Sequence, residues 1–303
     1  MVALVVAGGP GGETTASGPG RSLPTATTRP TAGTVSGETA TLLAAGDIGD
    51  CSSSGDEATA ALLDARPGAV VATLGDNAYP RGTAREFAEC YGPTWGRHRD
   101  RTRPAPGNHD YETAQASGYF GYFGRTAGEP GRAYYSYDLG SWHVVVLDSN
   151  CGGTSCRAGG VQERWLRADL AASGAACTLA YWHHPRFSSG SVHGSDEAVA
   201  PLFRALYEAG ADVVLAGHEH NYERFAPLDP SGEVDAARGI RTFVVGTGGR
   251  SHYGFGSPLT GSEVRNGDTF GVLELTLEPG GYRWQFVPEA GRTFTDSGRG
   301  ACH

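Results

Sequence analysis

The chain contains no lysine, so all 24 of its basic residues are arginine. A Walker A phosphate-binding loop and a Schiff-base mechanism each require a lysine side chain. Both of these enzyme classes are therefore excluded. The sequence also lacks any apolar run of about 18 residues, the length that a transmembrane helix needs.

Basic residues are also outnumbered, because 33 acidic residues leave a formal net charge of −9. A nucleic-acid-binding protein needs a basic face. The charge balance therefore argues against a nucleic-acid partner.

The six cysteines form no CxxC pair, so neither a zinc ribbon nor a CxxC redox motif is indicated. Their even number favours disulfides and an oxidising compartment. A local bridge between Cys151 and Cys156 is the simplest to envisage, and the other pairings stay open. We therefore expect an extracellular, secreted or cell-envelope protein.

Residues 1–39 are rich in glycine, threonine, serine and proline and poor in large apolar residues. Such a composition cannot bury enough surface to fold, so we predict a disordered linker there. Residues 1–7 are apolar but short and lack a basic start, which is compatible with the remnant of a signal or anchor segment. Residues 40–303 are expected to form one catalytic domain.

Short apolar stretches in this domain are each followed by glycine and polar residues. The stretches are residues 42–45, 70–74, 102–106, 177–182 and 213–216. Their length and flanking glycines favour buried strands, and we expect helices at about residues 56–65, 161–172 and 195–209. Alternating residues at 271–277 and 282–287 predict a C-terminal hairpin that completes a second sheet. Side chains that follow the strands should meet at the carboxyl edge of a sheet, where open α/β sheets bind their substrates.

Five motifs occupy these strand ends. They are Gly46-Asp47-Ile48-Gly49, Gly75-Asp76-Asn77-Ala78-Tyr79, Gly107-Asn108-His109-Asp110, His183-His184-Pro185 with Ser188, and Gly217-His218-Glu219-His220. Carboxylates and imidazoles suit divalent and trivalent metals, and one carboxylate can bridge two ions. Two ions about 3.5–4 Å apart can clamp the attacking and leaving oxygens of a phosphoryl displacement. The motifs therefore predict a two-metal hydrolytic site.

The ordered set GDxG, GDxxY, GNHD, HxPxxS and GHxH resembles the calcineurin-like metallophosphoesterases. Tyr79 in GDxxY makes it similar to the purple acid phosphatase branch, in a short single-domain form. The resemblance covers roughly Thr41 to the C-terminus. It implies an α/β fold in which a two-sheet β-sandwich is flanked by helices.

The resemblance also implies a binuclear centre in which Fe(III) lies beside a divalent iron, zinc or manganese. It assigns Asp47, Asp76, Tyr79 and His220 to the iron. It assigns Asn108, His183 and His218 to the divalent ion, with Asp76 as the bridge. His184 is an alternative to His183, but the HxPxxS spacing selects His183 and leaves His184 beside the ligands.

Three further residues are candidate catalytic groups. His109 is expected to act as general acid or oxyanion donor at the leaving group, with Asp110 orienting its imidazole. His193 is a second candidate, although it lies one residue further from Ser188 than the family pattern has it. The other histidines, His98, His143, His252 and His303, are expected to lie on the surface or to pack.

The predicted function is a secreted phosphatase that hydrolyses small phosphate monoesters by attack of a metal-bound hydroxide. One alternative is a phosphodiesterase or nucleotidase with the same metals. The other is a non-catalytic module that binds phosphate or metal and uses exposed aromatic residues to bind a partner.

The aromatic residues after GNHD, from Tyr111 to Phe123, are expected to pack, or alternatively to line a substrate pocket.

Overall fold

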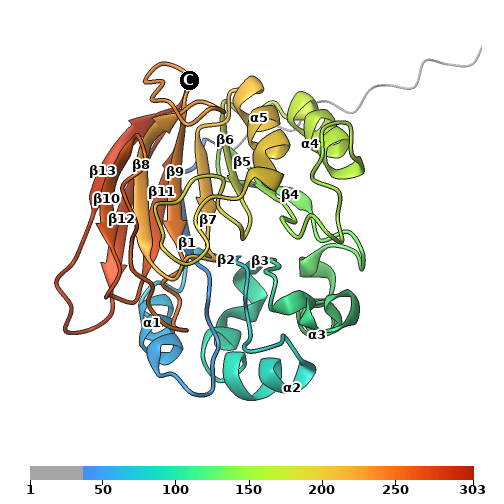
Figure 1. Cartoon of the computed structure of the whole chain (residues 1–303), viewed down its shortest axis with the longest axis vertical. Coiled ribbons are helices and arrows are strands. Elements are labelled where there is room, and N and C mark those ends of the chain that lie inside the picture. The colour runs from blue at the N-terminus through green and yellow to red at the C-terminus, as the bar shows by residue number, and fades with distance from the viewer. Residues whose placement is uncertain (1–36) are drawn as a thin grey trace, which may run out of the picture. The chain divides into compact units, whose positions relative to one another are not determined.

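A computed structural model describes residues 37–303 of the chain. The predicted linker at residues 1–39 lies outside the described residues, apart from its last three positions. The described part contains two β-sheets, and its helices lie beside them (Figure 1).

The first sheet has six strands in the order β13-β12-β11-β1-β2-β3. Their bounds are Ser297–Ala301 for β13, Gly281–Pro288 for β12, Gly271–Glu278 for β11, Ala40–Ala45 for β1, Val70–Leu74 for β2 and Thr102–Ala105 for β3. The strands β1, β2 and β3 run parallel, and β11 joins β1 antiparallel. The predicted C-terminal hairpin is β11 and β12.

The second sheet has seven strands in the order β10-β8-β9-β7-β6-β5-β4. Their bounds are Ser262–Asn266 for β10, Tyr222–Leu228 for β8, Ile240–Val245 for β9, Val213–Ala216 for β7, Cys177–Tyr181 for β6, Trp142–Val146 for β5 and Tyr135–Leu139 for β4. The central strands β5, β6, β7 and β9 are parallel. Their carboxyl ends therefore lie at one edge of the sheet.

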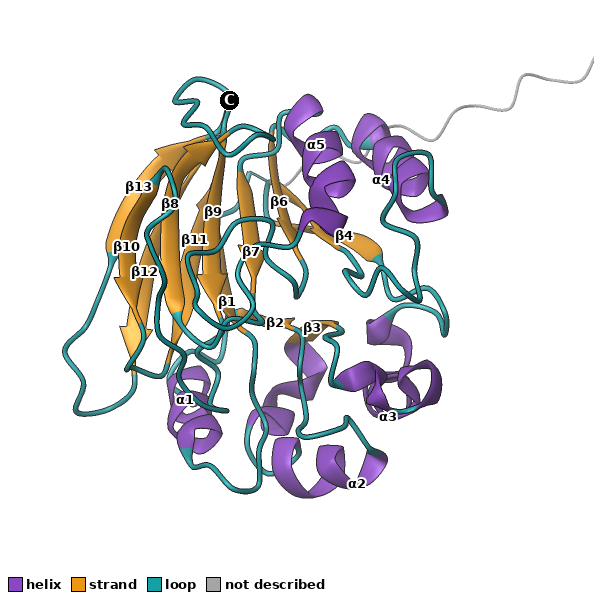
Figure 2. Ribbon diagram, viewed as in Figure 1, coloured by secondary structure: helices purple, strands orange, loops and turns teal. Residues whose placement is uncertain are grey.

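Two clusters of buried side chains hold these layers together. One contains residues from both sheets, including Leu275 of β11 and Phe243 of β9. The other joins the seven-stranded sheet to helices α4 (Val161–Ala172) and α5 (Ala200–Glu208), through residues such as Val145 and Phe203. Helix α1 (Gly55–Asp64) packs against β11, while the short α2 (Ala84–Glu86) and α3 (Ser117–Phe123) follow β2 and β3 (Figure 2). The predicted sandwich of two sheets flanked by helices is confirmed.

The helix expected at residues 195–209 begins later than predicted. Asp196 caps a 3-10 turn, Glu197–Val199, by accepting a hydrogen bond from the backbone of Ala198. Regular α-helix starts only at Ala200, where Pro201 occupies the first turn, in which its missing N–H is not needed.

The six cysteines form three disulfides, Cys51–Cys90, Cys151–Cys156 and Cys177–Cys302. The expected local bridge is confirmed. The bridge from Cys177 to Cys302 spans 125 residues and ties the start of β6 to the C-terminus.

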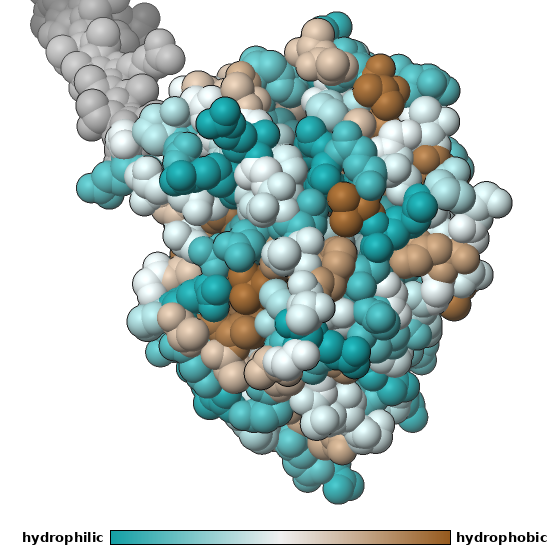
Figure 3. Space-filling model, turned by 90° about the vertical axis from the view of Figure 1, so that its left-hand side faces the viewer, coloured by the Kyte–Doolittle hydropathy of each residue, from teal (hydrophilic) through white to brown (hydrophobic). Residues whose placement is uncertain are grey.

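The face drawn in Figure 3 is mostly hydrophilic, with hydrophobic residues in small scattered groups. No helix within residues 37–303 is long and apolar enough to cross a membrane.

His143 of β5 is buried rather than on the surface, and it bridges two acidic side chains. Its Nδ1 lies 3.1 Å from Asp138 Oδ1, and its Nε2 lies 2.9 Å from Asp169 Oδ2 of α4. Burial alone would lower the pKa of His143, but hydrogen bonds to Asp169 and Asp138 outweigh it and raise the pKa. The folded protein therefore binds this proton more tightly than the unfolded chain does.

We predict that His143 stabilises the fold in a pH-dependent way. Because its folded pKa is raised, the contribution is complete below the unfolded value of about 6.5 and is lost as pH rises through the folded value. The glutamine in His143→Gln cannot titrate, so urea unfolding should show the largest wild-type advantage at acidic pH and a shrinking one above neutrality. An advantage that stays constant over this range would contradict the assignment.

Candidate metal centre

All seven predicted ligand positions lie at strand ends and come together. Asp47 follows β1, and Asp76 and Tyr79 follow β2. Asn108 follows β3, His183 follows β6, and the pair His218 and His220 follows β7. Both sheets thus contribute, and each side chain comes from the expected motif.

One half of the site gathers around Tyr79. The phenol oxygen lies 2.9 Å from Asp47 Oδ1 and 2.9 Å from Asp76 Oδ2. His220 Nε2 lies 3.3 Å from the same phenol oxygen and 3.2 Å from Asp47 Oδ1. All four side chains are buried.

The other half gathers around His183. Its Nε2 lies 3.1 Å from Asn108 Oδ1, 3.1 Å from His218 Nδ1 and 3.3 Å from Asp76 Oδ2. Asp76 therefore contacts both halves, as a bridging carboxylate would.

The atoms around His183 Nε2 are arranged so that one cation could be bound by several of them. His183 Nδ1 lies 2.8 Å from the carbonyl oxygen of Leu74, so this nitrogen carries a hydrogen and donates it. In the neutral ring Nε2 then presents a lone pair toward the lone pairs of Asn108 and Asp76. A proton on Nε2 could satisfy only one of these neighbours, whereas a metal ion could be bound by all of them. The residues present therefore fit a metal.

Backbone conformation brings these side chains close together. Asp47, Asp76 and His218 have φ values of 62°, 51° and 71°, which are uncommon for residues other than glycine and cluster at functional sites. Gly107 makes room for Asp76, because a Cβ at this position would lie 2.1 Å from Asp76 Oδ1.

The charges of the site are strongly coupled. Burial raises the pKa of Tyr79 well above its ordinary value, and the carboxylates of Asp47 and Asp76 raise it further. Burial alone would lower the pKa of His183, but the adjacent Asp76 carboxylate raises it to about 9. Without a strongly polarising cation, Tyr79 is therefore a neutral phenol that donates to a carboxylate.

His109 faces the site but is oriented differently from the prediction. Its Nδ1 lies 2.6 Å from the carbonyl oxygen of Pro80, so Nδ1 carries a hydrogen and Nε2 is left facing Asp76 Oδ2 at 3.9 Å. Nε2 is thus the ring nitrogen that faces the site. The imidazole is oriented by a backbone carbonyl, not by the expected carboxylate.

Asp110 is buried beneath this loop and does not contact the imidazole of His109. It accepts hydrogen bonds from the backbone of Gly107 at 2.8 Å and from the side chain of Asn77 at 2.9 Å. Burial raises the pKa of Asp110 to about 7, with a further contribution from Asp76. The expected contact between Asp110 and His109 is therefore wrong, because the side chain turns inward and fixes the GNHD loop.

His193 lies at the exposed rim of the site. Its ring stacks on His218 with 4.0 Å between centroids, and its backbone N–H donates to the buried carboxylate of Glu219. Glu219 also accepts from the N–H of Gly194 at 2.6 Å. Glu219, the third residue of the GHxH motif, thus anchors the loop that carries His193.

Sequence reasoning missed the residues that orient His220. Ser251 Oγ lies 2.6 Å from His220 Nδ1, and Tyr253 stacks on the imidazole with centroids 4.0 Å apart. The guanidinium of Arg250 lies 5.1 Å from the ring centroid of Tyr79. These residues follow the glycine-rich run 246–249, which was the only signal for them.

The aromatic residues after GNHD mostly pack. Tyr119, Phe120 and Phe123 belong to the buried core, and Tyr122 stacks on Phe87 at 5.0 Å. Tyr111 donates from its hydroxyl to Asp148 at 2.6 Å. The packing interpretation is confirmed for the three core residues.

Comparison with known proteins agrees with the fold. Residues 40–222 match the family model of the calcineurin-like phosphoesterases, and this match covers more than half of the chain. The chain belongs to the calcineurin-like phosphoesterase family. The family implies a metal centre, and the cluster of Asp47, Asp76 and His183 could hold it.

Sequence relatives place the chain in the purple acid phosphatase-like branch. Purple acid phosphatase 23 of Arabidopsis thaliana is 33% identical over 180 residues, which is 52% of this chain and 38% of that protein. Acid phosphatase A of Cryphonectria parasitica is 27% identical over 190 residues, which is 54% of this chain and 38% of that protein. The chain thus spans well under half of the length of these relatives.

Solved structures support the fold. The purple acid phosphatase PPD1 from yellow lupin seeds superposes with a TM-score of 0.70 at 18% identity, covering 86% of this chain and 53% of that one. GAP50, described as the anchor in the inner membrane complex of Plasmodium, superposes with a TM-score of 0.64 at 15% identity. The superposition covers 85% of this chain and 88% of that one.

We predict that divalent cations stabilise the metal-free protein. A cation that binds only the folded state adds about 2.7 kcal/mol to the free energy of unfolding at a hundredfold excess over its Kd. Urea unfolding with and without Zn²⁺ measures this gain, which should be much smaller in Asp76→Asn. The remote variant His143→Gln should gain as much as wild type, and an equal gain in Asp76→Asn would contradict the site.

Proposed function

We propose that this protein is a binuclear-metal phosphatase that hydrolyses small phosphate monoesters. The observation that carries the proposal is the convergence of Asp76, His183 and their neighbours with lone pairs facing one another, next to a histidine, His109, whose Nε2 faces the same site. A site with only a structural role would need neither the facing lone pairs nor the histidine beside them.

In this proposal Asp47, Asp76, Tyr79 and His220 would hold a trivalent iron. Asn108, His183 and His218, with Asp76 shared, would hold a divalent iron, zinc or manganese. When bound, such a pair of ions supplies an activated water and neutralises negative charge on the phosphoryl group. The tyrosinate in contact with iron would give the protein a visible absorption band.

The protein's own side chains would protonate or stabilise the leaving group. His109 in its protonated form would donate from Nε2 to the departing alkoxide oxygen, while Pro80 keeps the ring in place through Nδ1. His193, stacked on His218 at the rim, would stabilise the same oxygen or the substrate. Asp110 would act indirectly, because it fixes the loop that carries Asn108 and His109.

We further propose that the protein works outside the cytoplasm. Its three disulfides, with no free cysteine among the described residues, suit an oxidising compartment.

Hydrolysis of an aryl phosphate monoester and of the matching diester, compared over a range of pH, tests the proposal. We expect the monoester to be turned over preferentially. Preference for the diester would move the assignment to a phosphodiesterase or nucleotidase with the same metals. Absence of turnover in protein with both metals bound would favour a binding module.

Substitution of His109 tests its role in protonating the leaving group. In His109→Ala we expect full metal content and a loss of kcat of about 10²–10⁴-fold with alkyl phosphates, the usual contribution of general acid catalysis. The loss should be smaller with 4-nitrophenyl phosphate, whose leaving group needs little protonation. Loss of bound metal, or an equal loss of rate with both substrates, would instead make His109 a structural residue.

A further inference from the structure

His184, the residue after the proposed ligand His183, lies among the histidines of the site without a role in the proposed chemistry. Its ring centroid is 4.4 Å from that of His218 and 4.9 Å from that of His183. A nitrogen of each of these three rings lies within 4.8 Å of the others. The side chain is partly exposed.

The hydroxyl of Ser149 determines which nitrogen of His184 carries the hydrogen. Ser149 Oγ accepts hydrogen bonds from the backbone N–H of His183 at 3.3 Å and of His184 at 3.0 Å. A serine oxygen has two lone pairs, so its own hydrogen is left for His184 Nδ1, which lies 2.8 Å away. Nδ1 is therefore an acceptor, and the neutral ring carries its hydrogen on Nε2.

The Nε2–H of His184 has no partner within residues 37–303. Only Nδ1 of this ring makes a hydrogen bond there, and Nε2 is not among the buried polar atoms that lack one. It is therefore a donor of fixed direction that remains open to solvent, on a ring that lies beside the proposed ligands His183 and His218. In this tautomer Nδ1 accepts from Ser149 and Nε2 carries a hydrogen, so His184 could bind a metal only after one of these hydrogens had moved.

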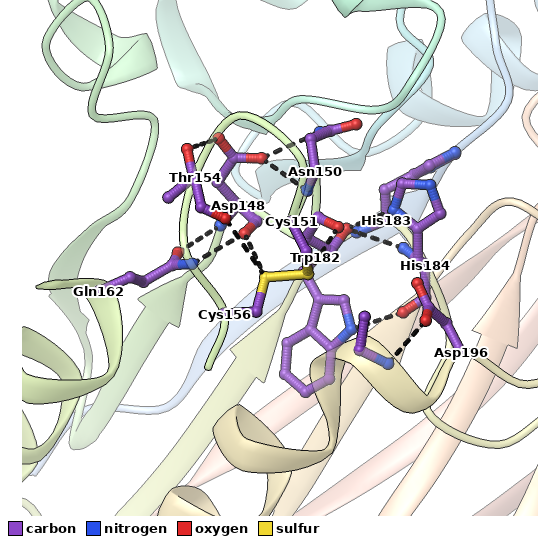
Figure 4. The surroundings of a disulfide bond; sticks show 12 residues. Asp148, Asn150, Cys151, Thr154, Cys156, Gln162, Trp182, His183, His184 and Asp196 are labelled. Carbon is purple, nitrogen blue, oxygen red and sulfur yellow. Dashed lines mark hydrogen bonds between the residues drawn. A yellow bond between two sulfur atoms is a disulfide. The ribbon is translucent and has the colours of Figure 1, made fainter. Parts of the chain in front are cut away.

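The loop that carries Ser149 is held by hydrogen bonds of Asp148 and by the Cys151–Cys156 disulfide, which are drawn in Figure 4. The neighbouring Asp148 exchanges two hydrogen bonds of 2.8 Å between its backbone and the side-chain amide of Gln162. Its carboxylate accepts from the hydroxyl of Thr154 at 2.8 Å and from the backbone of Asn150 at 3.0 Å. The Cys151–Cys156 disulfide then closes the loop two residues after Ser149.

We propose that His184 is a neutral hydrogen-bond donor to a phosphoryl oxygen of the substrate and that Ser149 is the positioning residue that fixes its tautomer. The donor role rests on the proposed phosphatase function. No proton is transferred, so His184 contributes to phosphate binding rather than to protonation of the leaving group. This distinguishes it from His109, whose Nε2 has no fixed hydrogen.

The tautomer is tested by nitrogen-15 NMR of metal-free protein labelled at histidine. His184 is assigned from the signals that disappear in His184→Phe. We expect a protonated Nε2 and an unprotonated Nδ1 in wild type, and a mixture of tautomers in Ser149→Ala. Ser173→Ala, which also removes a hydroxyl that accepts a backbone hydrogen bond but lies at the end of α4, should match wild type. A protonated Nδ1 in the wild-type protein would overturn the proposal.

The donor role is tested by titrating zinc-loaded protein with inorganic phosphate in a calorimeter. His184→Phe keeps the ring shape but removes the donor, and we expect phosphate to bind roughly 10- to 100-fold more weakly, as for loss of a hydrogen bond to a charged group. The amide nitrogen of a glutamine can occupy the place of Nε2, so His184→Gln should bind within about threefold of wild type, by the same reasoning.

The outcomes separate this proposal from the one on which it rests. Wild-type affinity in His184→Phe, or equal weakening in both variants, overturns the donor role while the phosphatase assignment stands. Loss of zinc from His184→Phe would make His184 a ligand and also overturns it. Failure of the wild-type protein to bind phosphate or hydrolyse any ester removes the proposed function itself, and the donor role with it.

Discussion

The structure depends on the crowding of lone pairs at the ends of its strands. Around His183 Nε2, the acceptor oxygens of Asn108 and Asp76 and the Nδ1 of His218 lie within 3.3 Å, and one proton on Nε2 can be directed at only one of them. An arrangement of this kind is costly in a buried, metal-free protein, because buried polar groups need partners. Bound cations turn the same arrangement from a repulsive one into an attractive one.

The scaffold is organised to withstand this crowding. Parallel strands from two sheets end at the same place, so the ligands come from rigid elements rather than from one flexible loop. Positive φ values at Asp47, Asp76 and His218 aim the side chains inward. The rings of His183 and His109 are oriented by the carbonyl oxygens of Leu74 and Pro80, which the surrounding backbone fixes.

Much of this organisation could be predicted from the sequence, because apolar runs that end in GDxG or GHxH give both the strand and its ligand. The strand β13 could not be predicted, since Ser297–Ala301 has no strand pattern. It pairs with β12 because the absence of a side chain at Gly298 leaves room for the ring of Trp284, and a Cβ there would lie 2.3 Å from it. The orientation of His109 by Pro80 could not be predicted either, because it depends on the tertiary arrangement of two loops that are distant in sequence. The motif also gave a wrong contact for Asp110. This residue follows His109 in the sequence, but its carboxylate does not lie beside the imidazole of His109.

The most direct test of the central claim is anomalous diffraction from crystals of the protein produced with iron and zinc in the medium. The account predicts two anomalous peaks about 3.5–4 Å apart, one on each side of the Asp76 carboxylate, with the peak beside Tyr79 strongest at the iron edge. A single peak, or two peaks that do not share Asp76, would contradict it.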